Sequence, residues 1–196
     1  MLHSDILVIM TVDTVFDVLV ERSLGAMRRL HDALAAAQIP YEVVGGMAVF
    51  LHVERVDPER ARLTRDINCC IRRIDLERIP AAVAPYGLVY RRVAGVDMLL
   101  DQAEPKARKA IHLLMAGERV RPEDPEPVPD LGSGELVMGA RITSIDNLLR
   151  MKLTSFRLKD QVHVQDLDGA GLITASMEAA LSPVLRDRLA QVRAAE

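Results

Sequence analysis

The feature that most constrains the fold of this chain is a short apolar segment that runs directly into two glycines. Tyr41 to Val44 is typical of a buried strand, Gly45 and Gly46 follow it, and Met47 to Val53 has the composition of a helix. Adjacent glycines let a phosphate approach the backbone, and the following helix offers free N–H groups at its positive end. The segment predicts a strand, a phosphate-binding turn and a helix. A tight turn that needs positive φ is the alternative.

Strand and helix patterns on both sides of this segment predict an α/β (α+β) fold. A helical pattern covers 14–38 and ends at Ile39-Pro40, and a loop rich in proline and acids covers 121–130. Further strands are expected at 65–71, 87–91, 95–100 and 110–115, and further helices at 74–84, 144–157, 176–181 and 182–194. We therefore expect a single domain, 1–196, with a mixed sheet flanked by helices. Its parts are N-terminal helices in 1–40, the sheet core in 41–142 and C-terminal helices in 143–196.

Composition places the chain among globular proteins and argues against several classes of function. Of its 196 residues, 49% are hydrophobic and 27% charged, which is too apolar for a disordered chain. No apolar stretch reaches the roughly 18–20 residues that span a bilayer, and the N-terminus carries acids where a signal peptide has bases. We therefore expect a cytoplasmic protein with no membrane partner. A net charge of −3 argues against a protein that coats nucleic acid. Cys69 and Cys70, the only cysteines, are expected to fill the core.

Three blocks of the sequence together resemble one protein family. They are Val43-Val44-Gly45-Gly46-Met47-Ala48, then Leu63-Thr64-Arg65-Asp66-Ile67-Asn68, and then Leu148 to Lys152 with Arg157-Leu158-Lys159-Asp160 and Asp166-Leu167. In this order they resemble the nucleotidyltransferase fold, in particular small bacterial members similar to abortive-infection toxins. The resemblance implies a nucleoside triphosphate as substrate, Mg²⁺ (or Mn²⁺) as cofactor, and transfer of a nucleotide to a hydroxyl acceptor on RNA or protein. It also implies a toxin-like role with a cognate antitoxin as partner.

The second of these blocks carries the residues that would bind the metal. Side chains alternate along a strand, so Asp66 and Asn68 are predicted to share a face and to bring two oxygens to one cation. The family has aspartate at both positions, whereas Asn68 offers an amide oxygen without charge. We therefore expect weaker metal binding. The alternative function is a nucleotide-binding or partner-binding module that has lost catalysis.

The third carboxylate of the family lies on a later strand, because two metal ions usually need three carboxylates on neighbouring strands. The segment 95–101 contains two aspartates. Asp97 is flanked by apolar residues and is the predicted ligand, whereas Asp101 near the strand end is more simply a solvent-exposed cap. The predicted catalytic residues are thus Asp66 and Asp97, and the predicted metal ligands are Asp66, Asn68 and Asp97.

Basic residues complete the predicted nucleotide site. Lys152 falls inside the apolar stripe of the helix expected at 145–156 and is predicted to reach the nucleotide phosphates. The alternative is a side chain that passes the core to reach water. Arg65 is predicted either to pair a phosphate or to orient Asp66. The predicted nucleotide-binding residues are Gly45, Gly46, Arg65, Lys152, Lys159 and Asp160.

The histidines carry less weight. His163 and Asp166 are three residues apart and can meet on one face of a helix. No serine or cysteine nucleophile is tied to them by a motif, so a structural hydrogen bond is favoured over acid–base catalysis. The other four, which show no metal-ligand spacing and are interpreted as incidental, are His3, His31, His52 and His112.

Overall fold

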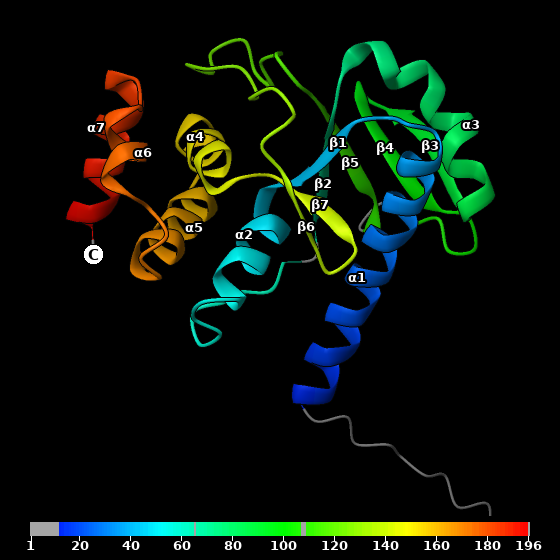
Figure 1. The fold of residues 1–196 in the computed structure, drawn as a ribbon, viewed down its shortest axis with the longest axis horizontal. Helices are drawn as coiled ribbons and strands as arrows, with labels where there is room; N and C mark the ends of the chain where they lie inside the picture. The colour runs from blue at the N-terminus through cyan, green and yellow to red at the C-terminus, as the bar shows by residue number, and fades with distance from the viewer. Residues whose placement is uncertain (1–11, 65, 107–108, 196) are drawn as a thin grey trace, which may run out of the picture.

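The computed structural model of the protein describes residues 12–64, 66–106 and 109–195 and has a seven-stranded mixed sheet at its centre (Figure 1). The strands lie in the order β3-β4-β5-β2-β1-β7-β6. They are β1 Tyr41–Val44, β2 Ile67–Ile71, β3 Leu88–Val93, β4 Val96–Asp101, β5 Ile111–Met115, β6 Glu135–Val137 and β7 Ala140–Ile142. Helices flank this sheet, which confirms the predicted α/β (α+β) class.

The register of the central strands decides which side chains share a face. β2 is antiparallel to β1 and parallel to β5, and β5 is antiparallel to β4. Val44, Asn68, His112 and Met98 therefore lie side by side across the sheet. Directly opposed residues point to the same side of a sheet. We call the side of these four residues the cleft face and the other side the core face.

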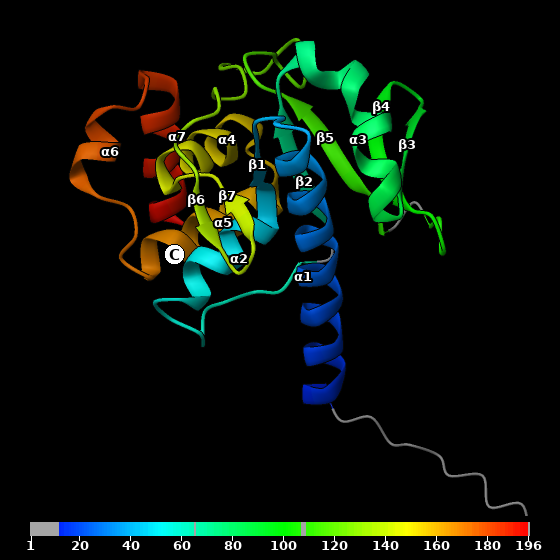
Figure 2. The same cartoon turned by 45° about the vertical axis from the view of Figure 1, so that its right-hand side comes forward.

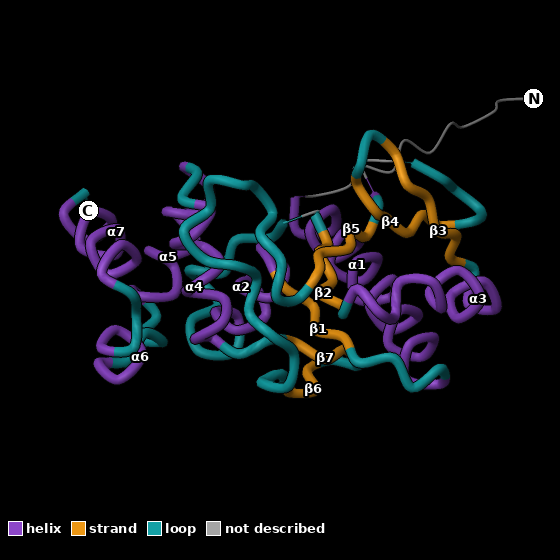
Figure 3. Tube along the Cα trace, turned by 90° about the horizontal axis from the view of Figure 1, so that it is seen from above, coloured by secondary structure: helices purple, strands orange, loops and turns teal. Residues whose placement is uncertain are grey.

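The helices gather toward the two ends of the sheet (Figures 2 and 3). They are α1 Val12–Ala36, α2 Gly45–Glu54, α3 Ile79–Val83, α4 Ile145–Ser155, α5 Leu158–Gly169, α6 Ala175–Ala179 and α7 Pro183–Ala194. Seen from above, α1 and α3 lie toward β3 and β4, whereas α4 to α7 form a group at the opposite end with α2 beside it (Figure 3). None of the helices in the described ranges is long and apolar enough to cross a membrane.

Two of the three apolar clusters among the described residues join these layers. The larger cluster joins the core face to the helices around it and includes Leu30 of α1, Val43 of β1 and Ile79 of α3. The smaller one lies among α4, α5 and α7. Cys69 and Cys70 are buried free thiols, so the prediction that they fill the core is confirmed.

The helix expected at 74–84 is broken into three short pieces. They are η1 Arg73–Arg78, α3 Ile79–Val83 and η2 Ala84–Tyr86, of which η1 and η2 are 3₁₀-helices. Pro80 and Pro85 lie in the first turn of the second and third pieces, where the N–H that proline lacks has no partner inside the helix. The two prolines therefore mark the starts of new pieces in a segment whose apolar pattern alone predicts one continuous helix.

The sequence analysis does not anticipate the hairpin of β6 and β7. Its turn residues Met138 and Gly139 both have positive φ, 49° and 83°. Two-residue hairpin turns of this kind favour Asn-Gly or Asp-Gly, and a methionine in the first place gives no such signal. The hairpin extends the sheet beyond β1 and leads the chain into α4.

Candidate functional site

The glycine turn lies where β1 passes into α2. Gly45 has φ of +78°, which is in the left-handed region, so the turn requires glycine there for conformational reasons. Val44 is the N-cap residue of α2, and no side chain caps the helix. The first N–H groups of α2 are thus left for another partner, as a phosphate-binding turn requires. The two interpretations of the glycine pair, a phosphate-binding turn and a tight turn that needs positive φ, are therefore compatible.

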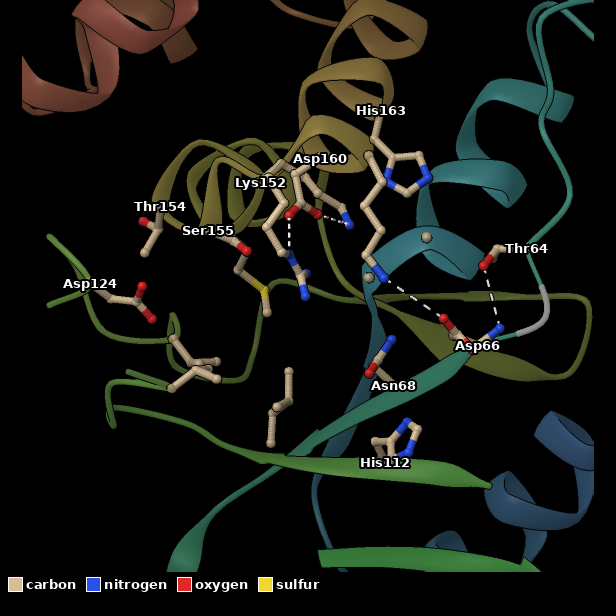
Figure 4. Close-up of a pocket in the computed structure, with 18 of the residues that line it drawn as sticks. Thr64, Asp66, Asn68, His112, Asp124, Lys152, Thr154, Ser155, Asp160 and His163 are labelled. Atoms are coloured by element: carbon tan, nitrogen blue, oxygen red, sulfur yellow. Dashed lines mark hydrogen bonds and ion pairs between the residues drawn. The ribbon is translucent and has the colours of Figure 1, made fainter. Parts of the chain in front are cut away.

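A cavity of about 520 Å³ opens in front of this turn (Figure 4). Its walls come from the cleft face of the sheet, from α4 and α5, and from the loop that follows β5. The structure brings seven of the predicted site residues to its lining: Gly45, Gly46, Asp66, Asn68, Lys152, Lys159 and Asp160. Arg65 lies outside the described residues.

Asp97, by contrast, does not line the cavity. It is next to Met98 on β4, and Met98 lies beside His112 on the cleft face, so Asp97 points to the core face. There the Tyr90 hydroxyl donates a hydrogen bond of 2.6 Å to its carboxylate. Asp101 is on the core face too and accepts a 2.6 Å hydrogen bond from Arg29 of α1. The register of β4 separates both aspartates from Asp66 and Asn68.

The strand next to Asn68 carries His112 at the directly opposed position. His112 lines the cavity, whereas the sequence analysis interprets it as incidental. The neighbour of His112 in the cavity, Asn68, is on another strand. The spacing of residues along the chain therefore could not identify His112 as a site residue. The available signal is an imidazole inside the otherwise apolar strand Ile111–Met115. The neighbouring strand therefore brings an imidazole, and not a carboxylate, to the side of Asn68.

The residues at this corner do not fit a centre of two magnesium ions. Asp66 precedes β2, has a side chain that is 56% exposed, and lies 3.8 Å from the ammonium of Lys159. Asn68 and His112 are an amide and an imidazole, which bring no negative charge. Among the described residues, no group of three or more His, Cys, Asp or Glu side chains is placed to hold a metal ion. Two Mg²⁺ ions need more anionic oxygen than one carboxylate supplies.

The joint of α4 and α5 holds an ion cluster at the middle of the cavity. Lys152 Nζ donates to Asp160 Oδ1 at 3.0 Å, and Arg157 Nε donates to Asp160 Oδ2 at 2.7 Å. Burial of Asp160 would raise its pKa, but Arg157 and Lys152 outweigh burial and hold that pKa at about 2. Lys152 thus points to a carboxylate inside the protein instead of passing the core to water.

His163 of α5 lies against the glycine turn. Its Cε1 atom is 3.2 Å from the position that a Cβ on Gly46 would occupy. Burial and then the charge of Lys152 lower the pKa of His163 to about 4, so its ring is neutral at pH 7. The predicted pairing with Asp166 is absent, because Asp166 Oδ1 accepts from Arg62 at 3.0 Å, and His163 Nδ1 is buried without a hydrogen-bond partner among the described residues.

Known structures define the class of this fold. The solution structure of the antibiotic-resistance factor ANT(2″)-Ia matches with a TM-score of 0.52 and 17% identity, over 93% of this chain and 95% of that chain. The crystal structure of ANT(2″)-Ia in complex with adenylyl-2″-tobramycin matches with a TM-score of 0.50 and 14% identity, over 92% of this chain and 98% of that chain. No family model and no curated protein sequence matches the chain. The protein has the nucleotidyltransferase fold, at a distance at which likeness shows the fold alone.

Proposed function

We propose that the cavity binds a nucleoside triphosphate with its phosphates at the glycine turn. The uncapped N-terminus of α2 supplies backbone donors, and Lys159 supplies a cation within the same wall. The cavity volume of about 520 Å³ is of the size that small-molecule sites have. The fold is that of proteins that handle nucleotides, which supports the same ligand class.

Binding without efficient transfer is the function that the residues support best. The observation that carries this conclusion is the adjacency of Asn68 and His112, two side chains that bring no negative charge, beside the single carboxylate of Asp66. Magnesium (or manganese) would neutralise phosphate charge in the bound nucleotide. Asp66 and Asn68 are the residues of this corner that offer it oxygen ligands.

Nucleotide transfer to a hydroxyl acceptor is the second candidate. Asp66, the first acidic position of the predicted motif, lines the cavity next to the glycine turn, and this observation favours transfer. ANT(2″)-Ia, one of the similar structures, was solved with adenylyl-2″-tobramycin. An RNA or protein acceptor, a toxin-like role, a cognate antitoxin and a cytoplasmic location stay predictions from the sequence.

Calorimetry with ATP, GTP, CTP and UTP, each with and without Mg²⁺, tests the binding proposal. We expect at least one of the Mg²⁺ complexes to bind, and Lys159→Ala to weaken it about 5- to 10-fold, since a charge-assisted contact to phosphate is lost. Lys106→Ala is a matched control, because Lys106 is 48% exposed, close to the 56% of Lys159, and does not line the cavity. Failure of all four triphosphates to bind below about 1 mM would reject the proposal.

Pyrophosphate release in the presence of total RNA separates the two candidates. Under the binding proposal the natural protein releases none above background, and the double variant Asn68→Asp with His112→Asp gains release because two carboxylates join Asp66. If the natural protein releases pyrophosphate and Asp66→Ala does not, the chain is a nucleotidyltransferase. In that case the change of metal ligands has not removed catalysis.

A further inference from the structure

The carboxylate of Asp66 already has a cation of the protein beside it. Lys159 Nζ lies 3.8 Å from Asp66 Oδ2, and both side chains are 56% exposed and line the cavity (Figure 4). Asp66 N–H donates to Thr64 Oγ1, and Thr64 Cγ2 lies 3.0 Å from the position of a Cβ on Gly46. Lys159 is four residues before His163, which lies against the same glycine, so the two share a face of α5. The ammonium, the carboxylate and the glycine turn therefore belong to one corner of the cavity.

Asn68 presents a hydrogen-bond donor to the glycine turn. Its Nδ2 atom is the nearest atom to the position of a Cβ on Gly45, at 2.6 Å. An ionised carboxylate in this place would only accept hydrogen bonds, whereas the amide can donate to an anionic oxygen. His112, which is directly opposed to Asn68, adds no carboxylate. The cleft face at this corner therefore suits a phosphate oxygen better than it suits Mg²⁺, which needs anionic oxygen ligands.

Cations outnumber carboxylates among the charged side chains that line the cavity. The carboxylates are Asp66, Asp124, Glu126 and Asp160, and the cations are Arg62, Arg121, Lys152, Arg157 and Lys159. Ion partners outside the lining leave this balance unchanged, because Arg150 pairs with Glu126 and Asp166 pairs with Arg62. The protein thus supplies positive charge of its own to an anionic ligand.

We propose that the cavity binds the nucleoside triphosphate without a metal ion, with Lys159 in place of the cation. This inference rests on the proposed function, because it assumes that the phosphates lie at the glycine turn. In the free protein Lys159 neutralises Asp66, and in the complex its ammonium turns to the phosphates. Mg²⁺ that arrives on the nucleotide adds no affinity, since this corner has a single carboxylate to receive it. The ligand is then the metal-free triphosphate anion.

Calorimetry with ATP, GTP, CTP and UTP, each in excess EDTA and in excess Mg²⁺, tests metal-free binding. For the nucleotide that binds tightest, we expect the two affinities to agree within about 3-fold. Lys159→Ala should weaken binding in EDTA about 10-fold, because no other cation takes the place of the lost ammonium.

The double variant Asn68→Asp with His112→Asp should make binding dependent on Mg²⁺. Its three carboxylates repel the phosphates when no metal is present, so EDTA should weaken the triphosphate about 10-fold or more. If EDTA weakens the double variant no more than the natural protein, the argument from Asn68 and His112 is wrong and metal-free binding is overturned.

Asp66→Asn gives a second measurement, in which the sign of the effect decides. If Asp66 only opposes the phosphates, its loss strengthens the triphosphate in EDTA about 2- to 5-fold; if Asp66 holds a metal ion, its loss weakens the triphosphate in Mg²⁺. The side chain is 56% exposed, so the variant should fold. Glu104→Gln is the matched control and should change nothing, because Glu104 is 45% exposed, also pairs with a lysine, and does not line the cavity.

Two results of these titrations overturn metal-free binding and leave the proposed function standing. One is a loss of more than about 3-fold when EDTA replaces Mg²⁺ on the natural protein, and the other is an Asp66→Asn variant that does not bind the triphosphate more tightly in EDTA. If no triphosphate binds the natural protein in either condition, the proposed function itself fails.

Discussion

At Gly45 both the backbone conformation and the packing of Asn68 require a residue without a side chain. Its φ of +78° excludes most other residues, and a Cβ there would lie 2.6 Å from Asn68 Nδ2. The amide of Asn68 therefore packs directly on the turn. A residue that must be glycine for geometric reasons also lets another group approach the backbone closely, which the proposed phosphate site requires.

We predict that Gly45→Ala destabilises the protein by about 1–3 kcal/mol, because the left-handed backbone and the contact with Asn68 both oppose a side chain. Urea denaturation measures the change. In an Asn68→Ala background the cost should fall by part of this amount, since the contact is relieved and the φ strain remains. Gly25→Ala in α1 is the control, because a Cβ there meets nothing within 4 Å. A cost at Gly45 no larger than at Gly25 would contradict the strained turn.

At the scale of elements, the joint between α4 and α5 is held by a buried ion pair. Asp160 lies in the first turn of α5, where the positive end of the helix also favours a carboxylate. The side chains of Lys152 and Asp160 are 7% and 1% exposed, so each needs the other to offset its loss of water. The pair links the last turn of α4 to the first turn of α5.

Removal of one partner of this pair should cost more than removal of both. We predict that Lys152→Met destabilises the protein by about 1–3 kcal/mol, less than for an isolated pair, because Arg157 still neutralises Asp160. Asp160→Asn should cost at least as much, since it leaves the Lys152 charge buried. A double-mutant cycle by urea denaturation at pH 7 measures the coupling. Additive single effects would show that the two side chains do not stabilise each other.

For the whole molecule, two apolar clusters share the same helices. α4 contributes Leu148 to the larger cluster and Leu149 to the smaller, and α5 divides Leu167 and Val164 in the same way. Ile173, which follows α5, packs against both clusters. We therefore expect that loss of packing in the C-terminal helices also destabilises the sheet, as the prediction of a single domain requires.

We predict that the chain unfolds in one cooperative step and that Leu185→Ala of α7 destabilises this step by about 2–4 kcal/mol, because it opens a cavity at a fully buried position. Urea denaturation followed by circular dichroism gives the total change. Amide hydrogen exchange of β2 and β5, which lie outside the smaller cluster, should accelerate by the same free energy. Two separate transitions, or unchanged exchange in these strands, would indicate two domains.

Local patterns were sufficient to predict much of the fold and part of the site. Tyr41 to Val44 and the two glycines predict their strand and turn correctly, and the predicted lysine helix is α4. These elements depend on neighbours in sequence, which a single chain makes visible. Asp97 could not be assigned in this way, because its face depends on the register between β4 and β5. The same holds for His112, whose partner Asn68 lies 44 positions earlier in the chain.

The sequence by itself determined most of the strands and helices, although not the hairpin of β6 and β7, together with the glycine turn and the presence of Asn68 where the resembling family has aspartate. Each of these is a property of a few consecutive residues. Only the tertiary structure decided which side chains share the cavity. It placed Asp97 on the core face and His112 beside Asn68. The physical reason is that one step in strand register moves every side chain of that strand to the other face of the sheet.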